Sequence, residues 1–287
     1  MRKPDLGPVA EMGRRMQRMM PDLSDDMLAA RAQYFLYLFL SVSLAQKLGM
    51  ECVVHTDDFG RAMLMRYGVG VDTVFISMDG EDLQKWGLAK MKTIADLSEP
   101  ALHIDHDVFL LKRQRDIPDA DLVVQNFEDP LVSPKTYPFY EAGLEDYRAD
   151  AGEIPPALKW LEDSGEPVAG WNCGYLEVHD VGFARKWAGE SIETFKPMKT
   201  FVHHNNIIAE QAILFAAGQR DGVAIRPLFR DLSTEPEIAG YVHLMGAKKR
   251  DRVETIVERV MARLWEADPA LAGRVRGDYA SGKFALA

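Results

Sequence analysis

The residues of this chain that most clearly suggest chemistry are two aspartates separated by a single residue. Asp105 and Asp107 follow an apolar run that starts at Ala101. In an extended backbone alternate side chains point to the same side, so the two carboxylates would lie about 7 Å apart along the strand. A hard divalent cation, Mg²⁺ or Mn²⁺, would relieve their repulsion. The pair is a candidate metal site; the alternative is a simple turn, which aspartate also favours.

Three short motifs follow this pair. In chain order they are Asn172 with Gly174, Glu210 with Gln211, and His243 with Gly246 and Lys249. Together with the Asp-x-Asp pair, and over roughly residues 31–265, their order resembles the GT-A glycosyltransferases, which are nucleotide-sugar-dependent enzymes with a metal-binding Asp-x-Asp motif. The His-x-x-Gly-x-x-Lys pattern is similar to that of the retaining family that includes galactosyltransferase and glycogenin-like enzymes.

The resemblance implies that Asp105, Asp107 and His243 bind Mn²⁺ or Mg²⁺. A neutral imidazole is an acceptable third ligand for Mn²⁺. The resemblance also implies a set of residues that faces the nucleotide diphosphate, namely Lys90, Asp105, Gly246, Lys248 and Lys249. Glycine allows close approach of the backbone to a phosphate, and lysine supplies positive charge. For the three lysines, the alternative is an ordinary exposed position on a helix.

Three residues are candidates for a catalytic role by the same resemblance. Asn172 would orient the donor sugar or the acceptor, and Glu210 or Gln211 would face the reacting carbon or bind sugar hydroxyls. The alternatives are a simple turn asparagine and two residues on a helix surface.

The expected function is therefore metal-dependent transfer of a sugar from a nucleotide-diphosphate donor, such as a UDP-sugar, to a glycan or small-molecule acceptor, with retention at the anomeric carbon. GT-A domains normally begin with a strand and loop that cradle the base, and residues 12–20 show no clear strand. A non-catalytic nucleotide- or glycan-binding module is therefore the first alternative. A metal-dependent phosphohydrolase, which could use the same carboxylates, is the second.

Composition limits the classes of partner. The chain has 287 residues, 47% hydrophobic content and a formal net charge of −10. That charge argues against a nucleic-acid-binding protein with a broad basic face. Two cysteines, Cys52 and Cys173, suit a reducing compartment. The first roughly thirty residues are largely polar and charged and show no cleavable signal peptide, so a cytoplasmic location is the expected default. The longest apolar run, Tyr34–Ala45, is shorter than the ~20 residues of a membrane span. Methionines between Met12 and Met20 leave peripheral membrane association open, and the oligomeric state is not indicated.

Strand-like and helix-like segments alternate along the chain. Strands are expected over 51–56, 71–76, 101–105 and 120–125, and helices over 34–45, 61–67, 82–97, 158–161, 183–195, 204–217 and 252–267. Asn172–His179 is expected to pass from a loop into a strand. Such alternation predicts an α/β, GT-A-like (Rossmann-like) fold with a mostly parallel sheet flanked by helices. Ligands bind at the carboxyl ends of such strands, where the aspartate pair falls.

Three regions are expected along the chain: a polar, Met-rich segment at 1–30, a catalytic domain at 31–268, and a tail at 269–287 that is loosely held from Gly273. Within the domain, residues 129–157 are an irregular, partly helical insertion on the acceptor side. Its aromatic residues, Tyr137, Phe139, Tyr140 and Tyr147, could stack on sugar rings or simply pack the insertion.

Three other groups of residues rank lower. Asp57 and Asp58 are a rival carboxylate pair, but adjacent side chains diverge. His203 and His204 are adjacent on an expected helix and would not share a face. His103 shares the side of Asp105 and could support it from behind, or be a core histidine.

Overall fold

The computed structural model describes residues 25–75, 86–128, 137–198, 206–244 except 231 and 233, and 253–281. The chain forms two compact units. The first unit comprises the described parts of Met1–Phe75, His106–Arg113 and Ala239–Ala287, and the second comprises those of Ile76–Asp105 and Gln114–Ile238. The predicted limits at residues 30 and 268 stay predictions.

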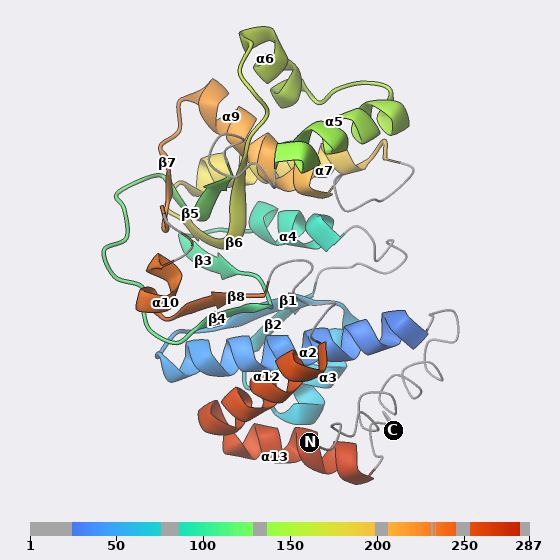
Figure 1. Ribbon diagram of the computed structural model, residues 1–287, viewed down its shortest axis with the longest axis vertical. Helices are drawn as coiled ribbons and strands as arrows, with labels where there is room; N and C mark the ends of the chain where they lie inside the picture. Colours follow the sequence, from blue (N-terminus) through green and yellow to red (C-terminus); the bar gives the residue numbers. More distant parts are fainter. Residues whose placement is uncertain are drawn as a thin grey trace. The chain divides into compact units, whose positions relative to one another are not determined.

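Helices and two small sheets make up the first unit (Figure 1). Its helices are α2 (Asp25–Lys47), α3 (Asp58–Tyr67), α12 (Val253–Ala267) and α13 (Pro269–Ser281). Strands β1 (Val53–Thr56) and β2 (Asp72–Phe75) pair in parallel, and β4 (Val108–Leu110) pairs antiparallel with β8 (Tyr241–His243). Helix α12 packs against α2 and α13, and buried apolar residues such as Leu40, Leu64 and Leu264 form the core.

Local signals explain where α3 begins and ends. The Asp57 side chain accepts a hydrogen bond from Gly60 N at 2.8 Å, which satisfies a free N–H of the first turn. Gly68 closes the helix with a left-handed backbone (φ 62°), which glycine adopts without a steric penalty. This agrees with the helix end predicted at Tyr67. Asp57 acts as a helix cap, and the side chain of Asp58 lies outside the described residues, so this rival carboxylate pair stays a prediction.

A four-stranded sheet with helices packed against it forms the second unit (Figure 1). Its strands are β3 (Ala101–Ile104), β5 (Leu122–Glu128), β6 (Gly170–Val178) and β7 (Ile225–Pro227), in the spatial order β3-β6-β5-β7. Its helices are α4 (Trp86–Ala95), α5 (Tyr137–Ala151), α6 (Pro156–Ser164), α7 (Val181–Phe195), the π-helical turn η1 (Ile208–Ala212), α9 (Ile213–Asp221) and α10 (Glu235–Ala239). The second unit ends at Ile238, within α10. Trp187, Leu176 and Ile213 are fully buried at the centre.

The chain is an α/β protein, as predicted, but the mostly parallel sheet is not confirmed. In the four-stranded sheet β6 runs antiparallel to both β3 and β5, and β5 and β7 are parallel. The last residue of β5, Glu128, pairs with the first residue of β6, Gly170. The segment between them, which contains α5 and α6, therefore returns the chain to the end of the sheet where β5 stopped. Alternation of elements along a sequence does not reveal such a return.

Two further expectations need correction. The tail was expected to be loosely held, but α13 continues to Ser281, and Val275 is fully buried. In the predicted insertion, α5 covers Tyr137–Ala151 and buries Tyr140 and Tyr147, so these two rings pack the core and do not form a stacking surface. The side chains of Tyr137 and Phe139 lie outside the described residues.

Among the described helices, none combines the length and apolar character that crossing a membrane requires.

Candidate functional site

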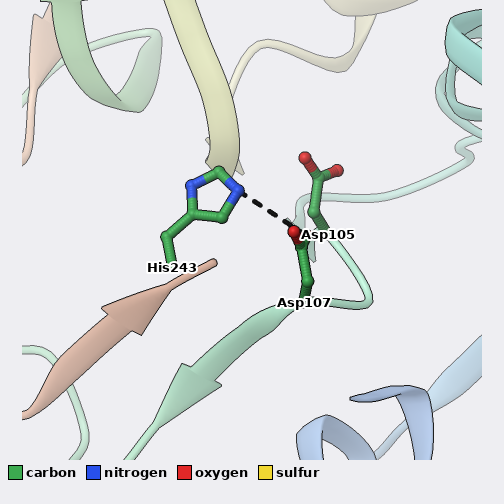
Figure 2. Close-up of side chains that lie close together, drawn as sticks. All are labelled: Asp105, Asp107 and His243. Carbon is green, nitrogen blue, oxygen red and sulfur yellow. Dashed lines mark ion pairs between the residues drawn. The ribbon is translucent and has the colours of Figure 1, made fainter. Parts of the chain in front are cut away.

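Strands β4 and β8 bring Asp107 and His243 together (Figure 2). Val108, next to Asp107, pairs with His243 across the ladder, and Leu244 N donates to Asp107 O at 3.1 Å. His243 Nε2 consequently lies 3.6 Å from Asp107 Oδ1, with side chains 10% and 4% exposed. Two residues 136 positions apart in the sequence thus form a nearly buried pair in one unit.

Asp105 precedes Asp107 by two residues, at the end of β3. Its backbone N–H donates to Gly174 O at 2.9 Å, which continues the β3–β6 pairing by one residue. Two residues of extended chain span at most about 7 Å, so chain connectivity alone keeps Asp105 near Asp107. One potential ligand atom from each of Asp105, Asp107 and His243 lies within 4.8 Å of the other two (Figure 2).

Two carboxylates and an imidazole form a donor set suited to a divalent metal ion. Carboxylates suit both Mg²⁺ and Mn²⁺, while the imidazole favours Mn²⁺ of the two. No second group of three such residues occurs in the part of the chain that the structure describes. The structure therefore brings together the three residues chosen from the sequence, and metal binding by them stays a prediction.

Lys90, on α4, lies inside the second unit and is 8% exposed, so the alternative of an exposed helix lysine is wrong. Its Nζ lies 2.7 Å from Asp105 Oδ1 and 2.7 Å from Glu210 Oε1, and it donates to Cys173 O at 3.2 Å. An ammonium group has three protons, and these contacts account for all three. Lys90 is therefore the counter-ion of Asp105 and Glu210 in this structure.

The charge state of this buried cluster follows from its contacts. Burial alone would lower the pKa of Lys90, but the Asp105 and Glu210 carboxylates raise it above its ordinary value, so Lys90 stays charged. Burial raises the pKa of Glu210, and Lys90 offsets only part of that increase. Glu210 Oε2 is buried and has no hydrogen-bond partner. His103, whose Nε2 lies 3.5 Å from Asp105 Oδ1, has its pKa lowered by burial and is neutral at pH 7.

Glu210 and Gln211 lie in the π-helical turn η1, all five residues of which are buried. The buried run continues through Gly218 of α9, so the core surrounds this helical segment on all sides. Glu210 is fully buried and Gln211 is 9% exposed, so the helix-surface alternative is wrong. Trp187 Nε1 donates to Glu210 O at 3.1 Å, which fixes this turn against α7. Gly87 N donates to the buried Asn206 Oδ1 at 3.1 Å, which fixes α4 to the residues before η1.

Asn172 lies within strand β6, so the predicted loop at Asn172 and Gly174 is wrong. Its Oδ1 accepts from Gly174 N at 3.0 Å, and its Nδ2 donates to Glu128 Oε1 at 2.9 Å. The carboxylate of Glu128 also contacts Tyr140. Sequence reasoning missed Glu128. The available signal was its position after Phe127, at the end of a strand-like stretch and just before the turn residues Asp129 and Pro130.

Several candidates lie outside the described residues. They are Gly246, Lys248 and Lys249 of the diphosphate set, and His203 with His204. Their roles stay predictions. Both cysteines are free thiols; Cys173 is fully buried and burial raises its pKa, as expected for a small core residue.

Comparisons with known proteins give one family and no named activity. No curated protein and no solved structure matches the chain. One family profile matches residues 28–276, which include every described residue of the candidate site. The chain therefore belongs to the Family of unknown function (DUF6734).

Proposed function

We propose that this protein is a metal-dependent glycosyltransferase that uses a nucleotide-sugar donor, with a UDP-sugar as the first candidate. The observation that carries the proposal is the group formed by Asp105, Asp107 and His243, whose ligand atoms lie within 4.8 Å of one another. These three residues also belong to the motifs whose order along the sequence resembles that of GT-A enzymes. Retention of configuration and a cytoplasmic location are parts of the same proposal.

The donor set fits the chemistry of this reaction. In glycosyl transfer the bond between the anomeric carbon and the diphosphate breaks with its electron pair, and the acceptor hydroxyl forms the new bond and loses a proton. A divalent cation held by the two aspartates and the histidine would stabilise the negative charge that grows on the diphosphate.

Polar residues of the second unit would act on the sugar side. Glu210 Oε1 and Asp105 Oδ1 both contact Lys90 Nζ at 2.7 Å, so they are at most twice that distance, 5.4 Å, apart. Glu210 has a buried oxygen without a partner, which a sugar hydroxyl would satisfy if donor binding opened the site around this fully buried residue. Asn172 and Gln211 offer amide groups for further hydroxyls. The acceptor would be a glycan or a small molecule with a hydroxyl group.

The substitution Asp107→Ala tests the metal site. Asp107 is 3% exposed and is one of only three proposed ligands, so its loss should weaken Mn²⁺ binding by more than the roughly 10–100-fold that loss of an outer-shell partner costs. Calorimetry of Mn²⁺, and of UDP, GDP and their sugar conjugates with and without Mn²⁺, measures this directly. The wild type should bind one nucleotide in a Mn²⁺-dependent manner.

Asp163→Ala is the matched control, since Asp163 is an exposed aspartate in the i,i+4 pair with Lys159. Unchanged Mn²⁺ binding in folded Asp107→Ala would refute the metal site. Nucleotide binding without transfer or donor hydrolysis would indicate a binding module. Release of phosphate from simple esters without a sugar acceptor would indicate a phosphohydrolase.

A further inference from the structure

The hydroxyl of Tyr140 joins two of the site's polar groups. Tyr140 extends from α5, is fully buried, and has its hydroxyl oxygen 2.7 Å from Glu128 Oε2 and 2.8 Å from Gln211 Oε1. Glu128 Oε1 accepts from Asn172 Nδ2 at 2.9 Å. One series of hydrogen bonds therefore links the amide of Asn172 on β6, through Glu128 and Tyr140, to the amide of Gln211 on η1. The Asn172 amide is held from a second side as well, because its Oδ1 accepts from Gly174 N at 3.0 Å.

Gly170 provides the space that this contact requires. A Cβ at position 170 would lie 2.0 Å from the Tyr140 hydroxyl and 2.4 Å from its Cζ, which is closer than any real contact. The backbone of Gly170 is not in the left-handed region, so its conformation does not require glycine. Space for the Tyr140 hydroxyl is then the reason for glycine here. Gly170 pairs with Glu128 across β5 and β6, which places the gap beside the carboxylate.

The number of protons available determines which group donates and which accepts in each of these hydrogen bonds. The Tyr140 hydroxyl has one proton and is close to both a carboxylate and an amide group. The charged acceptor forms the stronger bond, so the proton is donated to Glu128 Oε2. The hydroxyl oxygen must then accept from Gln211. Because amide oxygen and nitrogen are assigned from the hydrogen-bond network, this places Gln211 Nε2 towards Tyr140 and turns Oε1 to the opposite side.

We propose that Tyr140 and Glu128 are positioning residues that orient the amides of Gln211 and Asn172. Glu128 holds the Asn172 amide directly, and Tyr140 transmits the same constraint to Gln211, whose carbonyl oxygen then faces away from α5. This inference rests on the proposed function, in which the two amides contact the sugar. Neither Tyr140 nor Glu128 needs to touch a ligand for this role.

Side-chain amide signals report the orientation without any ligand. In the full chain with ¹⁵N-labelled asparagine and glutamine, the Gln211 and Asn172 signals are assigned by their loss in Gln211→Glu and Asn172→Asp. Tyr140→Phe removes only the hydroxyl and should shift the Gln211 signals. Glu128→Gln should shift both sets. Tyr175→Phe is the matched control, because it removes a hydroxyl bonded to Glu177 at 2.9 Å on the same strand and should move neither set.

Two further variants keep this test decisive. Gly170→Ala deletes no polar group but displaces the Tyr140 hydroxyl, so it should shift the Gln211 signals as Tyr140→Phe does. If Tyr140→Phe does not fold, Glu128→Gln carries the test, because it preserves the shape of the side chain. The proposal is overturned if the Gln211 signals do not shift in folded Tyr140→Phe or in folded Glu128→Gln.

Calorimetry then separates positioning from a structural role. In Mn²⁺, Tyr140→Phe should bind UDP within about twofold of the wild type, whereas its preference for UDP-glucose or UDP-galactose over UDP should fall by about tenfold, the size of one lost hydrogen bond. An equal fall for UDP and its sugar conjugates would mean a structural role only and would overturn the proposal. Absence of nucleotide binding by the wild type would overturn the proposed function alone. The amide signals would still show whether Tyr140 and Glu128 orient the amides of Gln211 and Asn172.

Discussion

The second unit contains two clusters of charged side chains that differ chiefly in burial. The buried cluster consists of Lys90, Asp105 and Glu210, and the surface cluster consists of Lys186, Glu190, Arg220 and Asp221. In the buried cluster one lysine is 2.7 Å from each of two carboxylates. In the surface cluster Arg220 forms two bonds to Glu190, at 2.7 and 3.1 Å, and shares Asp221 with Lys186.

The difference shows which cluster stabilises and which holds a site in place. The surface cluster links α7 to α9 with charges that water also solvates, so its formation changes little in free energy. In the buried cluster Lys90 and Glu210 have lost that water, with side chains 7% and 1% exposed, while Asp105 keeps part of it at 23%. One oxygen of the cluster, Glu210 Oε2, has gained no partner. Replacing such a cluster by apolar residues is often neutral or stabilising, while removal of one member leaves uncompensated charge. The contacts of the buried cluster therefore fix the positions of Asp105 and Glu210 and add little net stability.

Lys90→Met should give the largest effect. It leaves the Asp105 and Glu210 carboxylates near each other without a counter-ion, so the free energy of unfolding should fall by about 3–5 kcal/mol. Urea unfolding of the full chain measures it. Lys159→Met is the control, because Lys159 is an exposed lysine in the i,i+4 pair with Asp163, and it should cost less than about 0.5 kcal/mol. A loss below about 1 kcal/mol for Lys90→Met would show that the two carboxylates do not depend on this lysine.

The substitution Glu210→Gln tests the effect of burial on this carboxylate through the pH dependence of the free energy of unfolding. Burial raises the pKa of Glu210 in the folded protein, so the native state binds this proton more tightly than the unfolded chain. Its contribution to stability is then complete below the ordinary pKa of 4.5 and is lost as pH rises through the raised value. The wild type should therefore lose stability over this range, and Glu210→Gln should lose less. Urea unfolding of both proteins from about pH 4 to pH 8 measures the difference.

Glu193→Gln provides the comparison for a carboxylate at the surface, since Glu193 is exposed and pairs with Lys196. Its loss should change the free energy of unfolding at pH 7 by less than about 0.5 kcal/mol. If Glu210→Gln and the wild type lose stability in parallel as pH rises, then Glu210 has the same pKa in the folded and the unfolded protein, and burial does not raise it.

Local sequence signals predicted individual elements well. Asp57 and Gly68 delimit α3 because capping depends on a few neighbouring residues. The Asp-x-Asp pair and His243 were selected from motif order, and the β4–β8 ladder then brought Asp107 and His243 together. What the sequence did not reveal is strand direction, because β6 pairs antiparallel with β5 after a return through α5 and α6.

Long-range contacts account for the rest of what was missed. Lys90 contacts Glu210 across 120 residues, and no local pattern distinguishes a buried lysine on an apolar helix from an exposed one. Glu128 and Tyr140 became site residues only when β5, α5 and η1 were packed together. Gly170 carries a signal that could be recognised in retrospect: a glycine inside a strand often marks close approach of another group.

Asp221→Asn should give the smallest effect and tests the surface half of the comparison. Hydrogen bonds from Arg220 and Lys186 lower the pKa of Asp221 to about 2 from its ordinary 3.8. Stability from a lowered carboxyl pKa is present above the ordinary value and is lost as pH falls towards 2. The variant should be less stable than the wild type by at most about 1 kcal/mol at pH 7, and less still in high salt. Their unfolding free energies should converge on acidification. A larger loss, insensitive to salt, would mean that the surface cluster stabilises the unit as a buried one would, and burial would no longer explain the difference between the two clusters.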